Sequence, residues 1–116
     1  MTVAYMVEKV FLEEIRAANQ VWVAKGTCNN IYSQELNRGE ISLPVWSSSE
    51  RVSSFLKHAL LVGTKYEPHA ISLEVFTNAW LSDKMKGITE LQLNQDGKSD
   101  RVLAYTTEEF ISALSA

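Results

Sequence analysis

Residues 41–50 constrain the fold more than any other part of this 116-residue chain, because an apolar run passes there directly into helix-capping residues. Ser47 and Glu50 have the spacing of a capping box, in which a hydroxyl and a carboxylate bind unpaired backbone N–H groups of the first helical turn. Apolar residues then recur with helical spacing at positions 52, 55, 56, 59 and 60. The segment predicts a strand over residues 40–46 that leads into an amphipathic helix over residues 48–61.

Pro44 adds a constraint on this predicted strand. Proline has no backbone N–H, so in sheets it is confined to edge strands, strand ends and irregularities. We therefore expect the strand either at an edge of the sheet or with its ladder interrupted at Pro44.

The remaining elements follow from apolar periodicity and turn residues. Helical spacing is present over residues 3–18, from residue 72 onward and from residue 106 onward. Further strands are predicted over residues 20–25, 31–36, 88–95 and 100–105. Ser72 is a predicted helix cap, and Thr106 and Glu109 form a second capping-box pattern. The segment around Pro68, residues 65–70, is predicted to be irregular.

These elements predict an α+β fold in the order αβββααββα, with a mixed, largely antiparallel sheet of about five strands and helices packed on it. Short turns separate the first three strands, so these are expected to form an antiparallel meander. The length fits a single α+β domain over residues 1–116 and suffices to bury a core without disulfides.

Composition limits the partners and the location. The formal net charge is −3 and the basic residues are dispersed, which disfavours non-specific binding to nucleic acid. Cys28 is the only cysteine, so one chain can form neither a disulfide nor a cluster of thiolate metal ligands. No apolar run approaches the roughly 18 residues of a membrane span. Charged residues interrupt the N-terminal segment, so no secretion signal is expected either, and a cytoplasmic location is predicted.

The residues that could carry out catalysis lack a pattern that brings them together. His58 and His69 have neither metal-ligand spacing nor a triad-like order with acidic residues, and the glycines form no phosphate-binding loop. No catalytic residue, metal site or cofactor is therefore predicted. His69 lies in the segment expected to be a loop, which leaves an enzymatic alternative open, with His69 as a base assisted by Glu67 or Asp83.

Three tryptophans, Trp22, Trp46 and Trp80, are a large number for a chain of this size. Tryptophan combines a large apolar area with an N–H donor and is enriched at protein interfaces. Trp80 fits the core-facing stripe of its predicted helix. Trp22 and Trp46 are compatible either with a buried position or with a shared exposed patch.

Two segments resemble the bacterial "domain of unknown function 2750" family. The run Ser42-Leu43-Pro44-Val45-Trp46 is similar to the family's strand that ends in hydrophobic–Pro–hydrophobic–Trp before a helix. The run from Tyr66 to Phe76, followed by Trp80-Leu81, is similar to its Tyr-x-Pro-x-x-Ile-x-Leu-x-x-Phe segment and the helix that follows.

The resemblance covers about residues 5–115, although Ser82-Asp83 stands where the family usually has Pro-Gly. The final strand and helix also resemble, less closely, small secretion-associated enhancer domains. The family resemblance implies a compact α+β fold in a bacterial cytoplasm and brings no catalytic residues with it. It marks a shared set that could form a core or an interaction surface: Trp46, Tyr66, Pro68, Phe76 and Trp80.

We therefore predict an uncharacterised small soluble protein that acts as a non-enzymatic protein-interaction module. Its binding surface is expected at Trp46, the Ser47 cap and the segment with Tyr66, Pro68 and His69. The partner is expected to be another protein or a second copy of the chain, and neither nucleic acid nor a membrane. The alternatives are the small enzyme based on His69 and an immunity or secretion-associated binder, which differs from the first prediction only in its partner.

Overall fold

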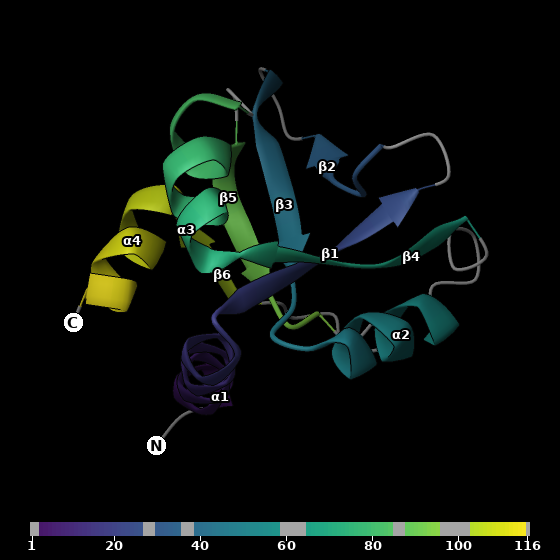
Figure 1. Ribbon diagram of the computed structural model, residues 1–116, viewed down its shortest axis with the longest axis horizontal. Helices are drawn as coiled ribbons and strands as arrows, with labels where there is room; N and C mark the ends of the chain where they lie inside the picture. The colour runs from purple at the N-terminus through teal and green to yellow at the C-terminus, as the bar shows by residue number, and fades with distance from the viewer. Residues whose placement is uncertain are drawn as a thin grey trace.

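The structure is a computed structural model and describes residues 3–26, 30–35, 39–58, 65–84, 88–95 and 103–115. Its helices are α1 (Val3–Ala18), α2 (Ser49–His58), α3 (Leu73–Val75), the π-helix η2 that continues α3 (Phe76–Lys84), and α4 (Thr107–Ser115). Its strands are β1 (Gln20–Gly26), β2 (Gln34–Glu35), β3 (Ile41–Val45), β4 (Tyr66–Ser72), β5 (Ile88–Leu93) and β6 (Leu103–Thr106). These elements confirm the predicted α+β class (Figure 1).

The described strands form two hydrogen-bonded groups, a four-stranded sheet in the order β2-β3-β5-β6 and a two-stranded β1–β4 ribbon. The pairing of β3 with β5 is parallel, and the other three pairings are antiparallel. The predicted three-stranded meander is wrong in its first pairing, because β1 pairs with β4 rather than with β2. Between β1 and the segment before β2, the structure has an isolated bridge from Lys25 to Ile31.

Trp22 and Trp46 connect the ribbon to the larger sheet. Each donates its backbone N–H to the carbonyl of the other, at 2.8 Å in both directions. On the same side of β3, Ser42 pairs with β2. Because hydrogen-bonding directions alternate along a strand, Pro44 faces this side too, between the two contacts. No described strand residue is paired with Pro44 there, so of the two predicted alternatives the structure has the interrupted ladder and not the edge position, because β3 lies between β2 and β5.

The prediction that residues 65–70 are irregular is wrong. Tyr66–Ser72 form β4, which pairs along its whole length with β1. Pro68 is compatible with this strand because β4 lies at the outside of the ribbon, where one side of the strand needs no donor. As a consequence, His69 belongs to a strand and not to a loop.

The helix starts show which local signals are reliable. The Thr106–Glu109 capping box is confirmed, with the Thr106 N–H bound to Glu109 Oε1 at 3.0 Å and the Glu109 N–H bound to Thr106 Oγ1 at 3.1 Å. The predicted Ser72 cap is also confirmed. The Ser47–Glu50 box is wrong, because Ser48 instead accepts the Arg51 N–H, at 3.3 Å, and Ser47 is bound elsewhere. Positions 59–61 of the helix predicted over residues 48–61, and Cys28, lie outside the described residues.

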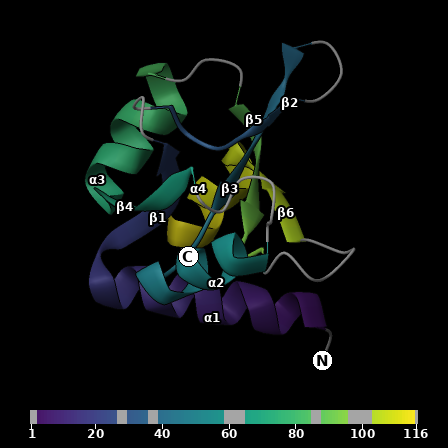
Figure 2. The ribbon, with the colours of Figure 1, turned by 90° about the vertical axis from the view of Figure 1, so that its right-hand side faces the viewer.

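The buried side chains form two clusters. The larger one joins the sheets to α1, η2 and α4, with edge-to-face contacts of Phe110 to Phe11 and to Phe76 at ring distances of 6.2 and 5.6 Å. Figure 2 shows α1 running along the lower side of the molecule. The smaller cluster lies between α2 and the β1–β4 ribbon and contains Ala24, Trp46, Val52, Phe55 and Leu56. The surface of the molecule next to this smaller cluster carries the candidate site.

Candidate functional site

A groove of about 880 Å³ lies between α2 and the first half of β4. We call it the α2–β4 groove and define it by its described lining residues, which are Ser49, Glu50, Ser53, Ser54, Leu56, Lys57, His58, Tyr66, Glu67 and Pro68. Leu56, Tyr66 and Pro68 give it an apolar surface, three serines lie along α2, and charged groups stand at its ends. Its volume is in the range of pockets that hold a small ligand or a few side chains.

The β4 side of the groove is an open strand edge. On β1, the backbone groups of Trp22 and Ala24 face away from β4, because they bind Trp46 and Tyr32. The alternate residues of β1 therefore face β4, and they pair there with Glu67, His69 and Ile71. It follows that the backbones of Tyr66, Pro68 and Ala70 point outward, where they have no partner among the described residues.

Aromatic rings support the groove from beneath. The ring of Trp46 lies 5.0 Å from that of Phe55, Phe55 lies 5.6 Å from Tyr32, and Tyr32 lies 5.6 Å from Tyr66. The hydroxyl of Tyr66 accepts a hydrogen bond from Asn30 Nδ2 at 3.0 Å. This row of rings fixes the position of Tyr66 and connects it to the core.

The four residues predicted for binding therefore have different positions. Tyr66 and Pro68 line the groove. Trp46 is 0% exposed and lies in the smaller cluster, so it supports the groove but belongs to no surface patch. Of the two tryptophans that could have formed a patch, Trp22 alone is partly exposed.

His69 lies apart from Trp46, Tyr66 and Pro68. Side chains alternate along a strand, so His69 lies on the face of β4 opposite to Tyr66 and Pro68, the face that carries the buried Ile71. Within the described part of the chain, no hydrogen bond or ion pair connects the His69 imidazole to a carboxylate. The side chain of Asp83, one of its two expected acidic partners, lies outside the described residues.

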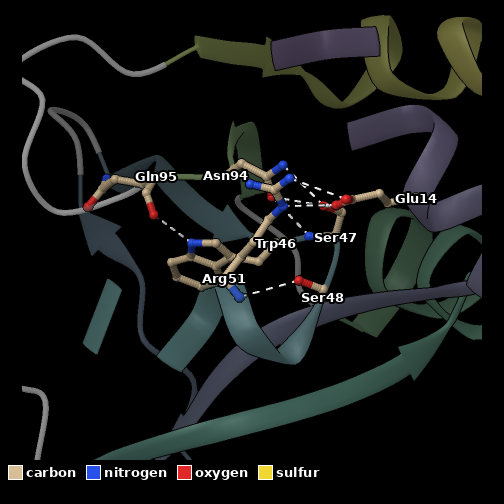
Figure 3. Close-up of polar contacts among 7 residues, drawn as sticks. All are labelled: Glu14, Trp46, Ser47, Ser48, Arg51, Asn94 and Gln95. Atoms are coloured by element: carbon tan, nitrogen blue, oxygen red, sulfur yellow. Dashed lines mark hydrogen bonds and ion pairs between the residues drawn. The ribbon is translucent and has the colours of Figure 1, made fainter. Parts of the chain in front are cut away.

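A network of polar side chains lies at the start of α2, next to the ends of β3 and β5 (Figure 3). Glu14, on α1, accepts hydrogen bonds from the Ser47 hydroxyl and from Arg51, with Arg51 Nε to Oε1 at 2.8 Å and Nη2 to Oε2 at 3.2 Å. Asn94 Oδ1 accepts the backbone N–H of Ser47 at 2.9 Å. Trp46 Nε1 donates to the carbonyl of Gln95 at 2.7 Å.

This network connects α2 to α1 and to the residues after β5, and it lowers the pKa of Glu14. The hydrogen bond from Arg51, aided by the one from Ser47 and by the positive charge of Arg51, lowers the pKa of the Glu14 carboxyl, although partial burial opposes the shift. The carboxylate in turn raises the pKa of Arg51. Glu14 and Arg51 are therefore a matched ion pair, and neither carries an uncompensated charge.

The network was not predicted from the sequence. Glu14 has the pattern of a solvated helix residue, and Asn94 was assigned to the end of a strand. A usable signal in the sequence is the asparagine at the end of the strand, because asparagine is one of the few residues that tolerate the left-handed backbone region; in the structure Asn94 follows β5 with a φ of 51°. The residues of the network come from three distant segments, α1, residues 46–51 and residues 94–95, so spacing in the sequence does not reveal them.

Two further observations bear on the class of protein. In residues 3–26, 30–35, 39–58, 65–84, 88–95 and 103–115, no group of three or more His, Cys, Asp or Glu side chains could hold a metal ion. Over the same ranges, no helix combines the length and the apolar character needed to cross a bilayer.

Comparison with known proteins supports the family resemblance found in the sequence. A family model described as "Protein of unknown function (DUF2750)" matches residues 8–114. No curated protein matches the chain. The matched range begins within α1 and extends almost to the end of α4. The chain therefore belongs to the DUF2750 family of proteins of unknown function.

Proposed function

We propose that this protein is an interaction module that binds an extended segment of a partner protein in the α2–β4 groove. The observation that supports the proposal is that an apolar groove borders an open strand edge. A peptide that adds to a sheet edge gains main-chain hydrogen bonds from the edge, and it gains specificity from pockets that take alternate side chains. The α2–β4 groove combines both features.

The open edge offers a limited set of backbone groups. Tyr66 and Ala70 each present an N–H and a carbonyl, whereas Pro68 between them presents a carbonyl alone. A bound segment can form ladder hydrogen bonds at both ends of this stretch and one at its centre. Each such bond contributes about 1 kcal/mol net, so most of the affinity must come from a side chain buried against Leu56, Tyr66 and Pro68.

The proposed site explains why the aromatic residues are so interconnected. Binding on a surface is strengthened when the groups that contact the partner are held in place before binding. Tyr66 is held by the ring of Tyr32 and by Asn30, and Tyr32 rests on Phe55. We extend the proposal to a bacterial cytoplasmic setting, which the family resemblance and the single cysteine favour.

A peptide-display selection tests the proposal. A library with seven random positions, the length of β4, is selected on the immobilised protein, and the affinity of the enriched peptides is measured by fluorescence anisotropy. The blocking variant is Ser53→Arg, because Ser53 is an exposed residue of α2 that lines the groove. The matched control is Ser112→Arg, an exposed position on α4 away from the groove.

We expect enriched peptides to bind the native protein and Ser112→Arg equally. Ser53→Arg is expected to weaken their binding by roughly tenfold or more, because its long side chain fills part of the groove. Failure to enrich any peptide, or equal binding by Ser53→Arg, contradicts the proposal.

A further inference from the structure

We infer that the α2–β4 groove accepts its segment in one direction, antiparallel to β4, and prefers a basic residue on the N-terminal side and an acidic residue on the C-terminal side of the segment. This inference rests on the proposed function and adds to it the chemistry of the partner. It is carried by the direction of two elements and by the charges at the two ends of the groove.

The two walls of the groove run in opposite directions. Figure 1 shows α2 and β4 side by side, with the end of α2 near the start of β4. Contacts between α2 and β4 confirm that the elements are packed together. The groove therefore has one end at Lys57, His58 and Tyr66, and another end toward Ser49 and Glu50.

These two ends differ in charge. At the first end, Lys57 lines the groove from α2, whereas the side chain of Glu67 alternates along β4 to the face opposite to Tyr66 and Pro68. At the second end, Glu50 is the charged lining residue; it forms no ion pair with another described residue, and the neighbouring Arg51 is paired with Glu14. The groove is thus positive where α2 ends and negative where α2 begins.

The direction of strand pairing determines which end of a bound segment lies near each charged end of the groove. Antiparallel pairing is somewhat more stable per residue than parallel pairing, so the added segment is expected to run opposite to β4 and therefore along α2. Its N-terminal side then approaches Glu50, and its C-terminal side approaches Lys57. Opposite charges at these positions attract and like charges repel, which gives direction and register to the bound segment.

The experiment uses the same library, selected in parallel on the native protein and on the charge-exchanged variant Glu50→Lys/Lys57→Glu. Sequences enriched on the native protein are expected to carry Lys or Arg before the apolar centre and Asp or Glu after it. Sequences enriched on the exchanged variant are expected to carry the opposite order. The tightest native peptide and its reversed-sequence twin are then compared by anisotropy.

We expect the twin to bind the native protein roughly threefold to tenfold more weakly at low salt, because exposed charge pairs are individually weak and two of them change sign. The difference is expected to shrink as salt is raised to about 0.15 M, where the screening length falls to about 8 Å. Urea unfolding shows whether the charge-exchanged variant is folded. If it is not folded, Glu50→Gln/Lys57→Gln is used instead. This neutral variant is expected to bind the peptide and its reversed-sequence twin equally.

The outcomes separate the two proposals. Enriched peptides without charge order, or equal binding of the peptide and its twin to the native protein, overturn the directional inference and leave the groove as a binding site. No enriched peptide at all overturns the proposed function itself.

Discussion

Arg51 and Glu14 connect α2 to α1 through two hydrogen bonds that share one carboxylate, at 2.8 and 3.2 Å. Both side chains are partly exposed, at 40% and 38%, so the pair belongs to the class of surface ion pairs. Its importance comes from the third group on the carboxylate, the hydroxyl of Ser47, because Ser47 is 2% exposed. Glu14 thus supplies an acceptor to a buried donor as well as a counter-charge.

Removal of either partner is expected to have unequal effects. Arg51→Ala is expected to lower the free energy of unfolding by about 0.5–1 kcal/mol, the usual worth of an exposed pair. Glu14→Ala is expected to cost about 1–2 kcal/mol, because it also weakens the hydrogen bonding of Ser47. Urea denaturation measures both, with the exposed neighbour Glu13→Ala as a control that should change stability by less than about 0.5 kcal/mol. Equal effects of the two substitutions would show that Ser47 does not depend on Glu14.

The lowered pKa of Glu14 predicts how stability depends on pH. The folded state holds the carboxyl below its ordinary value of 4.5, so its stabilising contribution is present above that pH and is lost as the pH falls through the folded-state pKa. We expect the stability difference between the native protein and Glu14→Gln to stay constant from about pH 7 to about pH 5 and to decrease below about pH 4.5. Urea midpoints at a series of pH values measure it. A difference that does not decrease in acid contradicts the assignment.

Asn94 has a left-handed backbone, with φ of 51°, and binds the backbone N–H of Ser47 through its side chain. Asn94→Ala and Asn94→Gly both remove the side-chain hydrogen bonds, but glycine adopts this conformation without steric cost. We expect Asn94→Ala to be less stable than Asn94→Gly by about 1 kcal/mol. The two variants are matched controls for each other in thermal or urea unfolding. The opposite order of stability would mean that the backbone at position 94 is not strained.

Iodide quenching of fluorescence tests the placement of the tryptophans. Trp46 is 0% exposed and Trp80 is 7% exposed, whereas Trp22 is partly exposed. We expect iodide to quench mainly the emission of Trp22, and Trp22→Phe to leave emission that is nearly insensitive to iodide. Strong quenching in Trp22→Phe would place Trp46 or Trp80 at the surface.

Local features of the fold were predictable because their causes lie within a few residues. The Thr106–Glu109 capping box, the Ser72 cap and the amphipathic pattern of α2 each depend on neighbours in the sequence. The interruption at Pro44 was predictable for the same reason, because the missing N–H is a property of the residue itself.

Pairings between distant segments were not predictable in this way. β1 and β4 pair residue 20 with residue 72, and no local pattern specifies that partnership. Pro68 predicts irregular structure when the sequence is read alone, because the sequence does not show that β4 has an outer side on which a donor is not needed. The candidate site depends on this pairing, so Tyr66 and Pro68 were identified while their relation to α2 was not.

The position of Pro68 has a consequence for the behaviour of the molecule at high concentration. An exposed edge strand has unpaired backbone groups, so the same edge of another copy can pair with it, which leads to aggregation. Pro68, in the middle of that edge, lacks one ladder donor, so a second copy of the strand pairs there less stably than it would with a residue that has an N–H. We therefore expect Pro68→Val, which restores the donor, to self-associate more than the native protein, measured by light scattering at high protein concentration, and equal scattering of the two proteins contradicts this role of Pro68.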